Sequence, residues 1–193
     1  GHPNIKLIEG KKPDFYTPDA KNGLTGFGID FVREMERLGM IVDVSHLSDA
    51  GFYDVFGHTE KPFVASHSNA REICGNVRNL TDDMIKKIAR RGGVIGINFF
   101  PGFLTGGEYA DDSGALLDAV VRHIRHIANV GGYECVGLGS DFDGMPGNSA
   151  MPDASHMPKL FDVLQKSGFT QGQIEAIYYK NVLRVLKEVL KDN

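Results

Sequence analysis

The chain has no tryptophan, only two cysteines and no long apolar run among its 193 residues. Cys74 and Cys135 lie far apart and neither belongs to a Cys-x-x-Cys pair, which argues against a disulfide scaffold and predicts two small buried side chains. No run approaches the roughly 18 apolar residues that cross a bilayer, so no membrane span is expected. A net charge of −4 argues mildly against nucleic acid as the main partner.

Two nucleotide-binding signatures are missing as well. Neither the Gly-x-Gly-x-x-Gly fingerprint nor a P-loop follows any apolar run, which counts against the nucleotide-binding forms of an open α/β sheet. The hydrophobic content of 41% and the charged content of 24% are ordinary for a globular protein. The sequence therefore predicts one sizeable domain over residues 23–193. Residues 1–22, rich in Lys, Gly, Pro and Asp, are expected to form a flexible N-terminal segment.

Short apolar runs, each followed by a helical pattern, predict buried parallel strands. The strands are expected at Met40–His46, Phe63–His67, Val94–Phe99 and Cys135–Gly139. The helices are expected near residues 25–38, 49–56, 81–91, 114–130, 158–166 and, as a closing pair, 170–190. Long loops are expected at Pro101–Gly107 and Met145–Met157.

The repeated strand–helix pattern predicts an α/β fold, in which a parallel sheet of about four strands is covered by helices with right-handed connections. Four strands are half of a (β/α)₈ TIM-like barrel, which usually takes about 250 residues. A small open doubly wound sheet is the alternative.

Polar side chains end these strands: His46, His67, Asn98 and Asp141. The carboxyl ends of barrel strands meet at one rim, so these side chains would face a common mouth. Two neutral imidazoles and a carboxylate suit zinc or a similar divalent ion, which converts bound water into a hydroxide nucleophile. An aspartate nearby can accept the proton and pass it on. Taken singly, each histidine is more often a capping or core residue, and Asp141 could be an N-cap.

Arg78 lies between the second strand-end histidine and a capped helix. An arginine there could bind a carboxylate with two hydrogen bonds, although a solvated surface arginine is the more common case. The remaining histidines of the domain are interpreted as structural, because they fall in loops or on helix faces: His58, His123, His126 and His156.

Several segments carry a resemblance to a known family. They are Gly23-Leu-Thr-Gly-Phe-Gly with Leu38-Gly-Met-Ile-Val-Asp-Val-Ser-His46, then Val64-Ala-Ser-His67-Ser, Val77-Arg78-Asn79, Val94-Ile-Gly-Ile-Asn98-Phe, Val136-Gly-Leu-Gly-Ser-Asp141-Phe-Asp-Gly144 and Asn181-Val-Leu-Arg-Val185. In this order they make the chain resemble the C-terminal half of the membrane (renal) dipeptidase family of zinc metallopeptidases, from Gly23 nearly to the end.

The resemblance implies a TIM-like barrel with a two-zinc site that hydrolyses dipeptides through a metal-activated hydroxide. His46 and His67 would bind the second zinc, and Arg78 would hold the C-terminal carboxylate of a dipeptide. Asp141 would meet the amino group of the substrate and shuttle the proton, and Phe103 would belong to the substrate pocket. A cytoplasmic location is expected, with an extracellular or anchored one as the alternative.

The family holds its first metal with a His-x-Asp pair and a bridging Glu, and neither His2 nor Glu9 follows a predicted strand that would make it their counterpart. The chain by itself is therefore expected to bind one zinc or none. We also expect it to form a homodimer, or to pair with a missing N-terminal half, since its sheet edges would otherwise be open. Two other functions stay open: another amidohydrolase-type metal barrel, and a non-catalytic assembly module.

Overall fold

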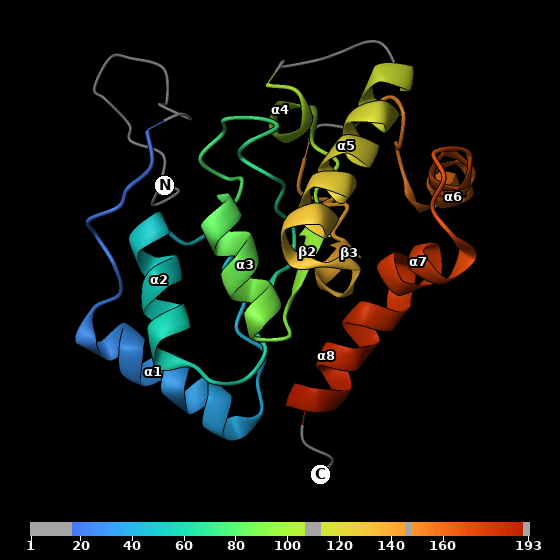
Figure 1. Cartoon of the computed structure of the whole chain (residues 1–193). Helices are drawn as coiled ribbons and strands as arrows, with labels where there is room; N and C mark the ends of the chain where they lie inside the picture. Colours follow the sequence, from blue (N-terminus) through green and yellow to red (C-terminus); the bar gives the residue numbers. More distant parts are fainter. Residues whose placement is uncertain (1–16, 107–112, 146–147, 191–193) are drawn as a thin grey trace.

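The computed structural model describes residues 17–106, 113–145 and 148–190. Its helices and strands alternate through most of the chain (Figure 1). They are α1 (Gly26–Leu38), α2 (Asp49–His58), β1 (Val64–Ala65), α3 (Asp82–Arg90), β2 (Val94–Ile97), α4 (Pro101–Leu104), α5 (Ser113–Gly131), β3 (Val136–Leu138), α6 (Met157–Lys166), α7 (Gln171–Glu175), a π-helical segment (Ala176–Lys180) and α8 (Asn181–Val189). Short 3₁₀ turns precede β3 and α6.

The sheet is parallel, in the order β1–β2–β3. The predicted strand Met40–His46 lies beside β1, but it forms only an isolated parallel bridge from Asp43 to Val64. Two hydrogen bonds hold it there, from the Val44 amide to the Val64 carbonyl at 2.8 Å and from the Val64 amide to the Val42 carbonyl at 2.9 Å. The ladder is short because β1 has only two residues and the chain turns at Ser45. Among the described residues the sheet does not close into a barrel.

One face of the sheet is covered by α3 and α5, which lie in front of it in Figure 1. The main core lies between these two helices and the sheet. Its largest fully buried side chains include Phe63, Ile85, Ile95, Ile97 and Ile124. These strands are apolar throughout, as buried parallel strands usually are. The prediction of a helix-covered parallel sheet is therefore confirmed, with three strands rather than four.

The opposite face of the sheet is only partly covered, by α8. Val94 packs there against Val185 and Val189 in a small second cluster. A pocket of about 260 Å³ remains beside this cluster, between the sheet and α8. In a closed barrel this sheet face would be the interior.

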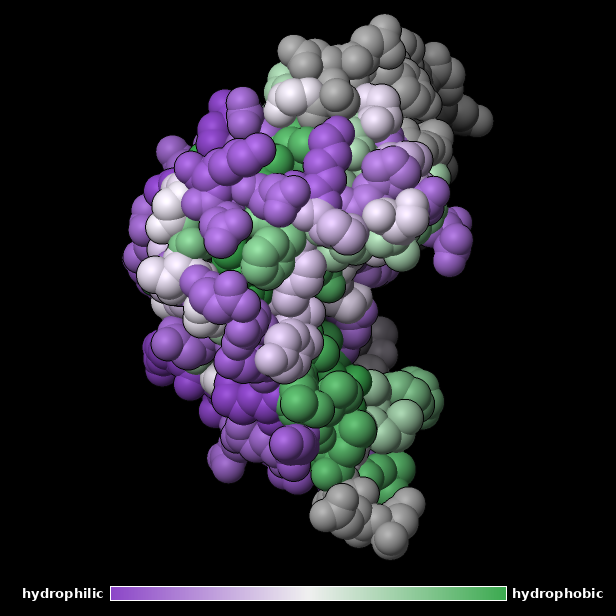
Figure 2. Space-filling model, turned by 90° about the vertical axis from the view of Figure 1, so that its right-hand side faces the viewer, coloured by the Kyte–Doolittle hydropathy of each residue, from purple (hydrophilic) through white to green (hydrophobic). Residues whose placement is uncertain are grey.

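Large apolar side chains are exposed on α8 and α1. Figure 2 shows an apolar area next to the C-terminal end of the chain, where α8 lies. The exposed residues of α8 and its C-cap are Val182, Leu183, Leu186 and Leu190, each at least 36% exposed. On α1, Phe27, Phe31 and Leu38 are more than half exposed. Clustered apolar side chains of this kind are uncommon on the surface of a monomer.

The helix ends agree with the sequence signals. The side chains of Thr25, Ser48, Thr81 and Thr170 each accept a hydrogen bond from a first-turn amide, and Thr170 with Gln173 forms a complete capping box. The predicted loop Pro101–Gly107 is wrong in part, because Pro101 begins the short helix α4. Proline suits that position, since the first helical amide needs no partner.

Residues 1–16 of the predicted flexible segment lie outside the described residues. Residues 17–22 form no helix or strand, but the carbonyls of Asp19 and Asn22 accept hydrogen bonds from the start of α2. Both cysteines are free and buried, as predicted. In the part of the chain that the structure describes, no helix combines the length and the apolar character that a bilayer crossing requires.

Two glycines allow the strands to approach closely beside the second strand-end histidine. A Cβ atom at Gly96 would lie 2.0 Å from the Ser66 carbonyl oxygen, and one at Gly139 would lie 1.8 Å from it. Both distances are far inside van der Waals contact with backbone, so only glycine fits at either position.

Candidate metal and substrate site

The two strand-end histidines face each other. His46 follows the edge segment and His67 follows β1, and each lies in a turn just beyond its strand. Their Nε2 atoms are 2.7 Å apart, and their ring centroids are 4.8 Å apart. The predicted meeting of these two imidazoles is thus present in the structure, while their role as metal ligands stays a prediction.

Both imidazoles are held in the neutral form. Burial lowers the pKa of His46 and of His67, and the nearby positive charge of Arg78 lowers both further. A neutral imidazole keeps one nitrogen lone pair for a metal ion. The pair therefore has the protonation state that a ligand pair requires at neutral pH.

The donor set fits a divalent ion incompletely. Imidazole nitrogen suits zinc, copper, iron and nickel, and His46 and His67 would supply two such ligands. Within the described ranges no group of three or more His, Cys, Asp or Glu side chains is arranged to hold a metal. Residues 17–106, 113–145 and 148–190 would thus supply at most part of a coordination sphere.

Arg78 lies beside this pair and is 6% exposed. Its Nη2 atom is 3.4 Å from His46 Nε2, and its guanidinium lies over the Phe103 ring at 5.3 Å from the centroid. Burial lowers the pKa of Arg78 to about 10, so the side chain stays charged at neutral pH. Arg78 forms no ion pair with any carboxylate of the described residues. The carboxylates of Asp141 and Asp43 offset part of the effect of burial on this charge, and a bound anion would offset more of it.

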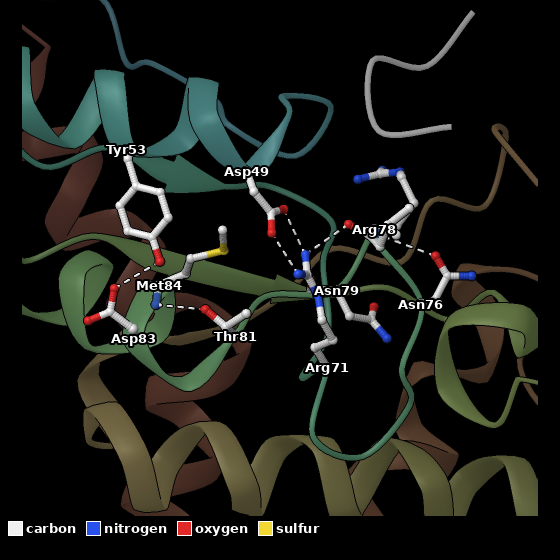
Figure 3. A network of polar contacts seen from close by, with 10 residues as sticks. Asp49, Tyr53, Arg71, Asn76, Arg78, Asn79, Thr81, Asp83 and Met84 are labelled. Atoms are coloured by element: carbon white, nitrogen blue, oxygen red, sulfur yellow. Dashed lines mark hydrogen bonds and ion pairs between the residues drawn. The ribbon is translucent and has the colours of Figure 1, made fainter. Parts of the chain in front are cut away.

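The loop that carries Arg78 is held by a partly buried ion pair, whose side chains are 17% and 11% exposed (Figure 3). Arg71 binds Asp49 at the start of α2 through two bonds, Nη1 to Oδ2 at 2.7 Å and Nη2 to Oδ1 at 2.8 Å. Arg71 also donates to the carbonyls of Asn79 and Val77, on either side of Arg78. The Arg78 side chain extends away from this network (Figure 3). The network therefore holds the loop backbone without engaging the Arg78 guanidinium.

Asp141 has an unusual backbone, with a positive φ of 65°. It is the one described residue other than glycine with a positive φ, a conformation that Asp tolerates better than most residues. Its Oδ2 accepts a hydrogen bond of 3.0 Å from Nδ2 of the fully buried Asn98. Strained backbone of this kind is common at functional sites, and here it directs a carboxylate into the site.

These side chains surround one cavity of about 170 Å³. It is lined by His46, Arg78, Phe100, Phe103, Asp141, Gly144 and Met145. Four of the predicted site residues therefore line this cavity, namely His46, Arg78, Phe103 and Asp141. His67 reaches the cavity through its contact with His46. Phe100 and Met145 are lining residues that the sequence did not indicate.

A further polar group lies behind His67. Asp43 Oδ1 accepts hydrogen bonds from the Ser45 and Ser66 amides at 3.1 and 2.9 Å, and Oδ2 accepts from the Ser66 hydroxyl at 2.5 Å. Burial alone would raise the pKa of Asp43, but these bonds from Ser66 and Ser45 outweigh it and lower the pKa. In the sequence, the one feature that could have indicated this role of Asp43 is that it is the single acidic residue inside the apolar run Met40–His46.

The other histidines make structural contacts. His123 is fully buried, and its Nδ1 accepts from the Ala70 amide while its Nε2 donates to the Leu104 carbonyl. Burial lowers its pKa to about 4. His126 binds Asp82 at 2.6 Å. These contacts agree with the structural interpretation of the histidines outside the strand ends.

Paired imidazoles, a buried arginine and an aspartate around one cavity at the ends of parallel strands are typical of metal-dependent hydrolases. Residues 9–192 match the membrane dipeptidase family, peptidase family M19, and the chain belongs to this family. The resemblance seen in the sequence is thereby confirmed.

Relatives are similar over most of this chain. It is 40% identical over 173 residues to an uncharacterized protein in the pqqA 5′ region of Klebsiella pneumoniae, covering 90% of this chain and 64% of that protein. It is 38% identical over 169 residues to the dipeptidase tcpJ of Claviceps purpurea, covering 87% and 39%. A metallopeptidase of Rhodobacter sphaeroides, solved with a phosphinate mimic of the dipeptide L-Ala-D-Ala, superposes with a TM-score of 0.82 at 32% identity, covering 89% of this chain and 49% of that one. The chain thus spans between about two fifths and two thirds of the length of these relatives.

Proposed function

We propose that this chain supplies the second-metal, carboxylate-binding and proton-transfer half of a dipeptide-hydrolysing site. His46 and His67 would hold a divalent ion, which we take to be zinc. When bound, that ion supplies Lewis-acid activation of water and of the scissile carbonyl. The proposal rests on membership of the dipeptidase family and on the cavity at the strand ends.

The observation that carries the proposal is the buried charge of Arg78. The guanidinium lines the cavity and forms no direct ion pair with a carboxylate of the described residues, although Asp141 and Asp43 lie near enough to raise its pKa. A free carboxylate is the group that a guanidinium binds best, through two parallel hydrogen bonds. A dipeptide places such a carboxylate one residue from its scissile bond, so Arg78 would select short substrates with a free C-terminus.

Asp141 would act at the other end of the substrate. Its carboxylate lines the same cavity as Arg78, and Asn98 holds one of its oxygens. A carboxylate there can bind a free amino group and accept a proton from the attacking water. Recognition of both termini within about 170 Å³ would favour a dipeptide over a longer peptide.

Calorimetric titration with the phosphinate mimic of L-Ala-D-Ala tests this function. The zinc-incubated chain is titrated with the mimic and with its C-terminal amide, which lacks the negative charge. We expect the acid to bind about 10- to 100-fold more tightly than the amide, and Arg78→Met to abolish the difference. Arg33→Met is the matched control, because Arg33 is an exposed arginine of α1 whose side chain is 58% exposed.

Equal binding of acid and amide would overturn the role of Arg78. Preference for the acid without any turnover of L-Ala-D-Ala would support the binding half of the proposal and place the remaining catalytic groups on other polypeptide. No binding of either compound would favour the non-catalytic assembly module.

A further inference from the structure

The Ser66 hydroxyl lies between a carboxylate and a strand-end imidazole. Its Oγ is 2.5 Å from Asp43 Oδ2 and 2.7 Å from His67 Nδ1. Asp43 is itself fixed, because Oδ1 accepts from the amides of Ser45 and Ser66. All three side chains lie at the open face of the sheet, and Asp43 and Ser66 are exposed there.

The direction of these hydrogen bonds follows from which atoms carry hydrogen. An ionised carboxylate has no hydrogen to donate, so the Ser66 hydroxyl must donate to Asp43. A hydroxyl has one hydrogen, so Ser66 Oγ can only accept from the His67 ring. Nδ1 of His67 therefore carries the ring proton, and Nε2 keeps the lone pair.

We propose that Asp43 and Ser66 are positioning residues that fix the tautomer of His67 and leave its Nε2 available as a metal ligand. That nitrogen is the one that faces His46, at 2.7 Å between the two Nε2 atoms, so in the metal-free chain His46 Nε2 carries the hydrogen and donates to His67 Nε2. The tautomer follows from the contacts alone, and only its purpose rests on the proposed function. Hydrogen bonds of this kind to the second nitrogen of a ligand histidine typically change metal affinity by 10- to 100-fold.

A purely structural role for Asp43 is the rival explanation, because Oδ1 also joins the edge segment to β1. Asp43→Asn separates the two roles. The amide oxygen can still accept from the two backbone amides, while the new NH₂ group faces Ser66 and donates to it. The Ser66 hydroxyl then no longer has to donate to residue 43, so it can turn and donate to His67 Nδ1, which is better placed than Ser45 Oγ at 3.4 Å, and we expect the ring proton to move to Nε2.

The chain contains a matched control. Asp153, Ser155 and His156 form a second group of the same residue types, with Ser155 Oγ 2.6 Å from Asp153 Oδ1 and 3.2 Å from His156 Nδ1. This group is exposed, lies just before α6, and does not line the strand-end cavity. Ser155→Ala therefore removes a serine from an Asp–Ser–His contact without touching His67.

The test is long-range ¹H–¹⁵N correlation NMR of the metal-free, ¹⁵N-labelled chain, at a pH where the rings are neutral. We expect the Nδ1–H tautomer for His67 in the unchanged chain and in Ser155→Ala. We expect the Nε2–H tautomer in Asp43→Asn and, since the acceptor is lost, in Ser66→Ala. Cobalt(II) affinity, followed by its visible absorption, should fall about 10-fold or more in both variants and not in the control.

Each outcome decides between the explanations. An Nε2–H tautomer in the unchanged chain, or an unaltered tautomer in both folded variants, would overturn the proposal. Weaker metal binding with an unaltered tautomer would also overturn it and leave Asp43 as a structural brace. Altered tautomers with unchanged cobalt affinity would support the hydrogen-bond chain and refute the ligand role of His67 on which the proposed function depends. Should Asp43→Asn fail to fold, Ser66→Ala retains the carboxylate and its bonds to the backbone amides.

Discussion

The ion pair between Asp49 and Arg71 allows a sharp test of how the site is held. Arg71→Met removes the guanidinium that forms two hydrogen bonds with the Asp49 carboxylate, whose side chain is only 11% exposed. It also removes the donors to the carbonyls of Val77 and Asn79. Removing one partner of a largely buried ion pair costs about 3–5 kcal/mol in the free energy of unfolding.

A double variant separates the energetic cost of breaking the ion pair from the cost of losing the two hydrogen bonds to the carbonyls. In Asp49→Leu/Arg71→Met both charges of the pair are removed, and the loss expected from Arg71 is then that of its two carbonyl bonds, about 1 kcal/mol each. We therefore expect about 2 kcal/mol of destabilisation for the double variant, which is less than for Arg71→Met alone. Such recovery defines the coupling between the two residues.

Urea unfolding, followed by circular dichroism, measures these differences. The control is Arg37→Met, which breaks the ion pair with Glu34 on α1, where the side chains are 67% and 51% exposed. Exposed ion pairs contribute about 0.5 kcal/mol or less, so the free energy of unfolding of this variant should stay close to that of the unchanged chain. The stabilising role of the Asp49–Arg71 pair is refuted if Arg71→Met lowers the free energy of unfolding no more than Arg37→Met does. It is also refuted if the double variant is less stable than Arg71→Met.

Three further predictions concern acid stability, the strained backbone and association. As the pH falls from about 6.5 towards 4, protonation of His123 should lower the free energy of unfolding by up to about 3 kcal/mol. The reason is that its pKa is about 4 in the folded chain, so the unfolded chain takes up the proton first. Urea unfolding at a series of pH values should show a smaller pH dependence for His123→Gln. Asp141→Ala should be about 1 kcal/mol less stable than Asp141→Asn, because asparagine tolerates a φ of 65° better than alanine, and an equal stability would contradict this. The chain alone should self-associate through α8, and Leu183→Glu should shift it to a monomer in sedimentation velocity; a monomeric unchanged chain would speak against that surface.

Local features of this fold could be predicted from the sequence because they depend on neighbouring residues. The N-caps at Thr25, Ser48, Thr81 and Thr170 each use a hydroxyl and an amide within three residues. The strands were visible as apolar runs, although the edge segment Met40–His46 pairs too briefly to count as one.

The meeting of His46 and His67 could also be predicted, because parallel strands end at one edge of a sheet and both histidines hold the same position relative to their strands. The contacts that orient the site could not. Arg71 reaches Asp49 across 22 positions in the sequence, and Asn98 reaches Asp141 across 43. No periodicity or spacing rule links such pairs, since the connection is made only when helices and strands pack.

The close approach of strands at Gly96 and Gly139 has a consequence for sequence variation. Any side chain there would collide with the Ser66 carbonyl, whether or not the protein binds a metal or a substrate. A saturation library selected only for folding should therefore return glycine at both positions. An unvarying glycine at either position is thus no sign of participation in chemistry, and a descendant that bound neither metal nor substrate would still keep both glycines.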